Sequence, residues 1–192
     1  MKILVTGGYG FLGGRIAAHL SHEGHDVTVG SRYPRTRPSW LEDGRTKIID
    51  WDDQDALRSL CKSQDVIVHA AGINARDSEN DPVLANNFNG EATGRLIDIA
   101  IDAGVDQFIY LSTAHVYHAA LSGEIFEGDQ VSNQHPYAAS HAKGENAILS
   151  AAKTSNIKAI VLRISNGFGP PMDTTVDCWS LFVNDICRQI VE

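Results

Sequence analysis

Tyr137 and His141 are the residues whose types and spacing most directly suggest acid–base chemistry. They lie four positions apart in a stretch that predicts a helix, so their side chains share one face, one turn apart. A phenol with a pKa of about 10 is a poor base near neutrality, although a nearby cation favours its ionised form. Histidine, with a pKa of about 6.5, is only about a quarter protonated at pH 7. Lys143 lies roughly 120° around the helix from Tyr137, so we do not expect it to supply the cation.

A second candidate site is the glycine-rich turn near the N-terminus. Gly7, Gly10 and Gly13 follow an apolar run and open an amphipathic segment. The first glycine permits a tight turn, the second lets the backbone approach a pyrophosphate, and the third allows close packing of helix and strand. The N-terminus of the following helix would present free N–H groups to the phosphates. The pattern favours dinucleotide binding, with a purely structural turn as the alternative.

The end of the second apolar run bears on the choice of cofactor. NAD sites usually place an acidic residue there, whereas the 2′-phosphate of NADP favours arginine. The sequence has Ser31 and Arg32 at this point, with Arg35 and Arg37 just beyond. We therefore expect NADP to be preferred over NAD. The alternative is that these arginines lie on a solvated loop.

Short apolar runs alternate with longer helix-like segments along the chain. Strands are expected at residues 3–5, 27–29, 47–49, 66–68, 108–111 and 159–162, and helices at 11–23, 87–103 and 137–153, with an apolar stripe over 179–190. Because the apolar runs are continuous, helices should cover both faces of the sheet. The order predicts a doubly wound parallel α/β sheet. We expect a Rossmann dinucleotide-binding domain over 1–170 and the start of an incomplete substrate-binding segment over 171–192.

The composition describes an ordinary globular protein of 192 residues, 43% hydrophobic, with a net charge of −8. The negative charge argues against nucleic acid as a partner. Three scattered cysteines argue against a disulfide framework and suit a reducing, cytoplasmic location. We expect no signal peptide, no membrane span of about 20 apolar residues and no metal site.

Several ordered motifs together resemble the extended short-chain dehydrogenase/reductase family, which includes nucleotide-sugar epimerases, dehydratases and reductases. The turn T-G-G-Y-G-F-L-G, D-V-I-V-H-A-A-G at 65–72 and L-S-T-A-H-V-Y at 111–117 are similar to its cofactor turn and its fourth- and fifth-strand motifs. R-I-S-N-G-F-G-P at 163–170 is similar to the segment leading into its sugar-nucleotide part. The resemblance implies cofactor-binding roles for Gly7, Gly10, Phe11, Leu12, Gly13, Ser31, Arg32, Asp50, Trp51, Ala70, Ala71, Gly72 and Asn87.

The resemblance also implies a catalytic group of Thr113, Tyr137 and His141. Thr113 would bind the reacting oxygen of a nucleotide-sugar substrate. Tyr137 would pass a proton to or from that oxygen while hydride moves to or from a nicotinamide. His141 stands where the family has lysine and would hold the cofactor ribose through a ring N–H. The family further implies a homodimer formed through the helices near 87–103 and 137–153.

Two functions are compatible with these residues. The first is an NAD(P)-dependent nucleotide-sugar epimerase or ketosugar reductase, which the retention of both Thr113 and Tyr137 favours. The second is a non-catalytic NADP-binding module. It is suggested by the loss of the lysine, because His141 in its place supplies little permanent positive charge. Dehydration is disfavoured, because Ala114-His115 stands where dehydratases of the resembled family often carry Asp-Glu.

Overall fold

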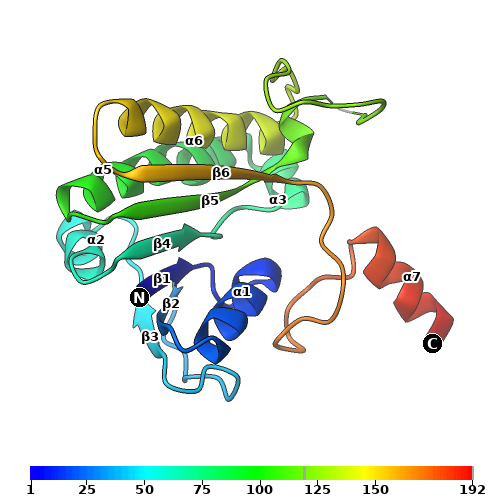
Figure 1. Cartoon of the computed structure of the whole chain (residues 1–192). Helices are drawn as coiled ribbons and strands as arrows, with labels where there is room; N and C mark the ends of the chain where they lie inside the picture. The colour runs from blue at the N-terminus through cyan, green and yellow to red at the C-terminus, as the bar shows by residue number, and fades with distance from the viewer. Residues whose placement is uncertain (119, 192) are drawn as a thin grey trace.

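The computed structural model describes residues 1–118 and 120–191 and contains a six-stranded parallel sheet (Figure 1). The strands are β1 (Lys2–Thr6), β2 (Asp26–Ser31), β3 (Arg45–Ile48), β4 (Val66–His69), β5 (Gln107–Thr113) and β6 (Lys158–Ile164). Their order in the sheet is β3-β2-β1-β4-β5-β6, with every neighbouring pair parallel. The predicted doubly wound Rossmann-type sheet is confirmed. Its strand order reverses between β1 and β4, and such sheets bind ligands in the crevice at that point.

Helices cover both faces of the sheet. On one face α1 (Phe11–His22) packs over β1 and β2, where Val5, Ala17 and Val29 are fully buried. On the other face lie α2 (Gln54–Cys61), α5 (Thr93–Asp102) and α6 (Pro136–Lys153) (Figure 1). The connections also contain the short helices α3 (Ala75–Asn80), α4 (Pro82–Ala85) and η2 (Ala114–Val116). Leu4 packs into one layer and Val5 into the other, so the strands must be apolar on both sides.

The helix predicted at 87–103 is divided in two. Residues Asn86–Ala92 form a π-helical segment, η1, before α5 begins. Such segments are rare and are frequent at functional sites. Within η1 the buried Asn89 accepts the Ile73 N–H at 2.7 Å and donates to the Ser140 hydroxyl at 3.0 Å. The π-helical segment therefore ties the loop after β4 to helix α6.

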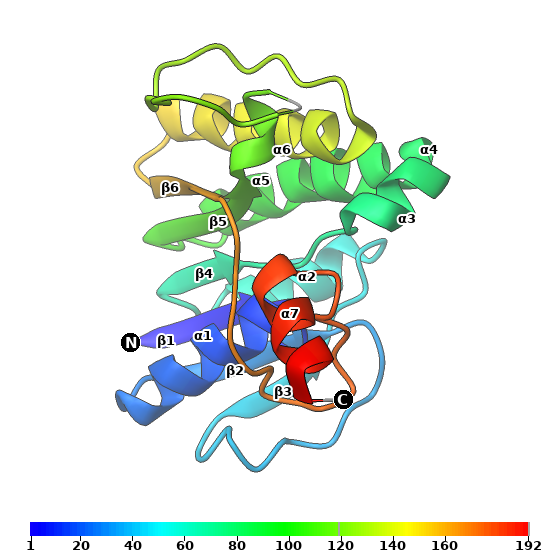
Figure 2. The same ribbon diagram turned by 90° about the vertical axis from the view of Figure 1, so that its right-hand side faces the viewer.

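Helix α7 (Phe182–Val191) lies beyond the carboxyl ends of the strands (Figure 2). The segment before it contacts α1, where Arg15 Nη1 donates to the Phe168 carbonyl at 2.5 Å. The predicted apolar stripe is largely exposed, with Phe182 74% and Ile190 78% accessible. Within the described residues, no helix combines the length and apolar character needed to cross a membrane. The division of the chain after residue 170 stays a prediction.

Candidate functional site

The glycine turn after β1 has the geometry that a phosphate-binding turn requires. Gly7 has φ +65°, and a Cβ there would lie 2.7 Å from the Ala71 backbone. A Cβ at Gly13 would lie 2.3 Å from the carbonyl oxygen of Gly7. Gly10 is the N-cap of α1 and has no side chain that could accept a hydrogen bond. The first N–H groups of the helix, from Phe11 onward, therefore have no capping partner and can bind a ligand. These N–H groups and the helix dipole fit the pyrophosphate of a dinucleotide.

A cavity of about 260 Å³ opens beside this turn. It brings together many of the predicted cofactor residues: Gly7, Gly10, Ser31, Arg32, Trp51, Ala70, Ala71 and Gly72. Its apolar wall includes Phe88, whose ring meets that of Trp51 edge-on at 5.0 Å. Two guanidinium groups border it, with Arg32 5.9 Å from the Phe88 ring and Arg35 5.2 Å from the Tyr9 ring. The cavity therefore combines aromatic surface for a base with cations for a phosphate.

The remaining predicted cofactor residues do not line this cavity: Phe11, Leu12, Gly13, Asp50 and Asn87. Asp50 is exposed and accepts the Asp52 N–H at 3.0 Å, and Asn87 is exposed on η1. Their cofactor roles stay predictions. Tyr9 and Phe88 line the cavity without having been predicted. Tyr9 lies inside the glycine turn and Phe88 follows Asn87, so an aromatic residue beside a predicted cofactor residue was the sequence signal that could have identified them.

Thr113 and Tyr137 meet at the carboxyl end of β5. Thr113 ends that strand and is buried, while Tyr137 lies in the first turn of α6, which begins at Pro136. His135 caps the helix, because its Nδ1 accepts the Tyr137 N–H at 3.2 Å. Burial raises the pKa of Tyr137, and a hydrogen bond with the Thr113 side chain opposes that shift. The two hydroxyl groups are therefore adjacent, as is needed to hold one reacting oxygen.

His141 is buried one turn further along α6. Its Nδ1 lies 2.7 Å from the Tyr110 hydroxyl, and its ring meets the Tyr137 ring edge-on at 4.6 Å. A Cβ placed on Gly72 would lie 3.8 Å from His141 Nε2, so this edge of the ring faces the wall of the cavity beside the glycine turn. Burial lowers the pKa of His141 to about 4. The ring is therefore neutral at pH 7, and the expectation that about a quarter of it would be protonated is wrong.

Lys143 is directed away from Tyr137, as helix geometry predicts. Its ammonium group contacts the Glu91 carboxylate at 2.5 Å and Asn86 Oδ1 at 3.1 Å, both on η1. The contact with Glu91 is exposed on both sides. This lysine therefore adds no positive charge at the phenol of Tyr137.

His69, at the end of β4, is a buried histidine with both ring nitrogens hydrogen-bonded. Its Nδ1 lies 2.7 Å from the Thr6 hydroxyl and its Nε2 lies 2.9 Å from the Thr93 hydroxyl. Burial lowers the pKa of His69 to about 3, with a smaller contribution from His141. Both ring nitrogens are engaged, so neither is available to a substrate. Across residues 1–118 and 120–191, no group of three or more His, Cys, Asp or Glu side chains is placed to hold a metal ion.

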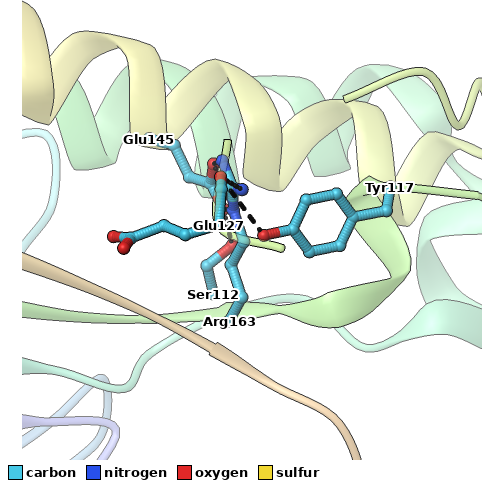
Figure 3. Close-up of polar contacts among 5 residues, drawn as sticks. All are labelled: Ser112, Tyr117, Glu127, Glu145 and Arg163. Atoms are coloured by element: carbon cyan, nitrogen blue, oxygen red, sulfur yellow. Dashed lines mark hydrogen bonds and ion pairs between the residues drawn. The ribbon is translucent and has the colours of Figure 1, made fainter. Parts of the chain in front are cut away.

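A buried acid that was not predicted from the sequence anchors helix α6. Glu145 is 2% exposed, and it accepts hydrogen bonds from Ser112 Oγ at 2.5 Å and Arg163 Nη2 at 2.7 Å (Figure 3). Arg163 also donates to the Glu127 carbonyl at 3.1 Å, and its guanidinium carbon lies 4.6 Å from the Tyr117 ring centroid. These contacts join α6 to β5, β6 and the loop before α6. The sequence signal that could have identified Glu145 is its position four residues after His141, on the same face of the predicted helix.

Known proteins share this fold and sequence pattern. The chain is 29% identical over 181 residues to the low-salt glycan biosynthesis protein Agl12 of Haloferax volcanii, covering 88% of this chain and 58% of that protein. It is 31% identical over 182 residues to a dTDP-glucose 4,6-dehydratase of Streptomyces antibioticus, covering 88% and 54%. The solved structure of a UDP-glucose 4-epimerase from Thermus thermophilus in complex with NAD matches with a TM-score of 0.81 at 26% identity, over 92% of this chain and 59% of that one.

These matches also show how much of a longer protein the chain represents. It spans 58% of the length of the Haloferax protein and 54% of the Streptomyces dehydratase. The NAD dependent epimerase/dehydratase family matches residues 3–189, which is almost the whole chain. The matched range extends from β1 into α7, and the glycine turn, Thr113 and Tyr137 lie within it. The chain therefore belongs to the NAD dependent epimerase/dehydratase family.

Proposed function

We propose that the protein transfers hydride to or from a sugar linked to a nucleotide, as an NAD(P)-dependent epimerase or ketosugar reductase. The observation that carries this proposal is the Thr113–Tyr137 pair, which lies next to His141 at the wall of the cofactor cavity. The family to which the chain belongs also supports the proposal, as do relatives named dTDP-glucose 4,6-dehydratase and UDP-glucose 4-epimerase.

Each residue of the pair has a defined task in such a reaction. A bound nicotinamide would supply the hydride chemistry. The Thr113 hydroxyl would donate a hydrogen bond to the reacting oxygen of the sugar, and Tyr137 would exchange a proton with the same oxygen. His141 would orient the cofactor ribose with the nitrogen that faces Gly72. Strand β5 and helix α6 fix these groups before the substrate binds. The reaction therefore needs little further loss of side-chain entropy to orient them.

Turnover assays with a matched control test this function. The substrates are UDP-glucose and dTDP-glucose with NAD⁺ or NADP⁺, and the readouts are cofactor absorbance and the sugar products. Tyr137→Phe should abolish turnover, and Thr113→Val should lower it by about 10²-fold or more. Lys143→Gln should leave turnover unchanged, because this lysine is exposed and engaged on η1. His141→Lys should raise the rate near neutral pH, since a cation favours tyrosinate.

A cofactor-binding module without catalysis is the second candidate. It is favoured by the neutral, buried His141, which gives Tyr137 no cationic neighbour. In that case the protein would bind NADPH tightly, and no reaction of any nucleotide sugar would depend on Tyr137. Tyr137→Phe would then leave both NADPH affinity and every measured rate unchanged.

We further propose that NADP is preferred over NAD. Support comes from Ser31, Arg32 and Arg35, which line one cavity at the end of β2, where an NAD site usually has an acid. Charge-assisted hydrogen bonds of about 1.5–3 kcal/mol predict that Arg32→Ala/Arg35→Ala weakens NADPH binding about 10- to 100-fold. NADH affinity should stay nearly constant, as measured by cofactor fluorescence. An equal loss for both cofactors would contradict the preference.

We also propose that two copies associate through the outer faces of α5 and α6. The exposed apolar residue Leu149 on α6 and the exposed Val83 and Leu84 on α4 support a contact on this side. Light scattering of the full chain should give the mass of a dimer. Leu149→Glu should give a monomer that retains NADPH binding.

A further inference from the structure

Tyr9, a residue of the glycine turn, is hydrogen-bonded to the loop between β2 and β3. Its hydroxyl donates to the carbonyl oxygen of Thr36 at 2.9 Å and lies 3.0 Å from the Thr46 hydroxyl. A phenol has a single proton to donate. When that proton goes to Thr36, the Thr46 hydroxyl must be the donor to the phenol oxygen. Tyr9 therefore ties the glycine turn both to the loop and to strand β3.

The loop that Tyr9 holds carries Arg35. Thr36 directly follows Arg35 in the chain, and the guanidinium carbon of Arg35 lies 5.2 Å from the centroid of the Tyr9 ring. Arg35 is exposed, and an arginine loses much rotamer freedom when it is held in one position. The face of the Tyr9 ring attracts the guanidinium group, which offsets part of this entropy cost. Tyr9 therefore restricts both the backbone beside Arg35 and its charged end.

The two arginines that line the cavity beside the glycine turn lie against different rings. Arg32 lies 5.9 Å from the ring of Phe88, which meets Trp51 on the apolar wall. Arg35 lies against the ring of Tyr9, within the turn that fits the pyrophosphate. In a dinucleotide the adenosine ribose lies between the base and the pyrophosphate. With the base on the aromatic wall, Arg35 lies on the ribose side of the cavity.

Arg35 is also available to an anion. The other arginine of the loop, Arg37, is engaged within the loop, because its Nη1 donates to the Leu41 carbonyl at 2.9 Å. Leu41 is fully buried, so the loop is anchored to the core at this point as well. Across residues 1–118 and 120–191, no carboxylate forms an ion pair with Arg35. A phosphate on the ribose can therefore take the charge-assisted hydrogen bonds of this guanidinium group.

We propose that Tyr9 is a positioning residue for cofactor choice, which holds Arg35 where the guanidinium group meets the 2′-phosphate of NADP. The inference rests on the NADP preference under the proposed function and adds to it a residue outside the β2–β3 loop. NAD has no 2′-phosphate, so the positioning of Arg35 contributes nothing to its binding. Tyr9 thus favours NADP over NAD without contacting the phosphate group that distinguishes them.

A double-mutant cycle with Arg35 tests this role. Cofactor fluorescence gives the NADPH and NADH affinities of the full chain, and calorimetry with adenosine 2′,5′-bisphosphate and 5′-AMP gives those of probes without nicotinamide. Arg35→Ala should weaken binding of NADPH and of the bisphosphate about tenfold, as for one charge-assisted hydrogen bond. Tyr9→Leu should weaken it about fivefold, because the ring and the hydroxyl are both lost. Affinities for NADH and 5′-AMP should change less than about twofold in either variant.

The effects of the two substitutions should not add. In the Arg35→Ala background, Tyr9→Leu should change NADPH affinity less than about twofold, since no guanidinium group remains to be positioned. Arg32→Ala is the matched control background, because Arg32 lies against Phe88. There Tyr9→Leu should keep its full effect of about fivefold. Equal losses in all three backgrounds would overturn the role of Tyr9.

Tyr9→Phe completes the cycle even when Tyr9→Leu does not fold. Phenylalanine keeps the ring against Arg35 and removes the hydroxyl that bonds Thr36 and Thr46. NADPH binding should weaken about threefold, and this loss should disappear in the Arg35→Ala background. An unchanged NADPH affinity in Tyr9→Phe, or a loss that persists without Arg35, would contradict the inference.

The outcomes separate this inference from the proposed function. When Arg35→Ala weakens NADPH and NADH equally, the proposed NADP preference fails and the inference fails with it. When Arg35→Ala weakens only NADPH while Tyr9→Leu weakens both cofactors or neither, the inference alone fails. All of these are binding measurements, so none of them depends on turnover of a nucleotide sugar.

Discussion

Replacing Arg163 by methionine should destabilise the protein strongly, because it leaves Glu145 as a buried charge without its partner. The two side chains are 20% and 3% exposed, and Arg163 approaches the Glu145 carboxylate with Nη2 at 2.7 Å and Nε at 3.1 Å. Methionine retains much of the apolar stem of arginine and removes the charge. The hydrogen bond from Ser112 remains and only partly compensates the carboxylate.

The expected loss is about 3–5 kcal/mol, the usual cost of removing one partner from a buried ion pair. The lost contact between the guanidinium group and the Tyr117 ring adds about 0.5–1 kcal/mol. For a chain of this size each kcal/mol lowers Tm by about 2–4 °C, so Tm should fall by about 7–24 °C. Urea unfolding followed by circular dichroism gives the free energy of unfolding, and differential scanning calorimetry gives Tm.

Two companion variants make this test specific. Arg58→Met breaks a pair with Asp55 that is exposed on both sides, 38% and 95%, and should cost no more than about 0.5 kcal/mol. Arg163→Met/Glu145→Leu removes both charges, so it should be more stable than Arg163→Met alone. A loss below about 1 kcal/mol in Arg163→Met, or a double variant no more stable than it, would refute this account of α6.

Three further results are expected. His69 and His141 are held neutral, with pKa values of about 3 and about 4 against about 6.5 when unfolded, so stability should be full above about pH 6.5 and fall by a few kcal/mol toward pH 4. Urea midpoints across this range check it, and a flat profile would contradict it. Gly13→Ala should abolish NADPH binding in a fluorescence titration, because its Cβ would lie 2.3 Å from a carbonyl oxygen of the turn. A thiol reagent at neutral pH should label the exposed Cys187 well before Cys61, since burial raises the pKa of Cys61 to about 12, and equal labelling would contradict this.

The parts of the fold that follow from local signals were predictable. The apolar run at Leu4 and Val5, followed by glycines and then an amphipathic segment, predicted a strand, a phosphate-binding turn and a helix, and β1 and α1 occur there. The π-helical segment Asn86–Ala92 was not predictable, since it depends on Asn89 bonding to a loop and to α6. A helical period within one segment carries no information about such partners.

The sequence by itself determined the parallel sheet, the glycine turn and the Tyr137–His141 pair, because periodicity, spacing and residue type are properties of neighbours in the chain. Thr113 became a candidate through the family resemblance. The tertiary structure alone decided the protonation of His141. Burial lowers its pKa, and the Tyr110 hydroxyl, 31 residues away in sequence, holds the ring in place. The structure also decided that Glu145 is buried and is paired with Arg163. Desolvation and pairing depend on which residues meet in space, so they are fixed only when β4, β5, β6 and α6 come together.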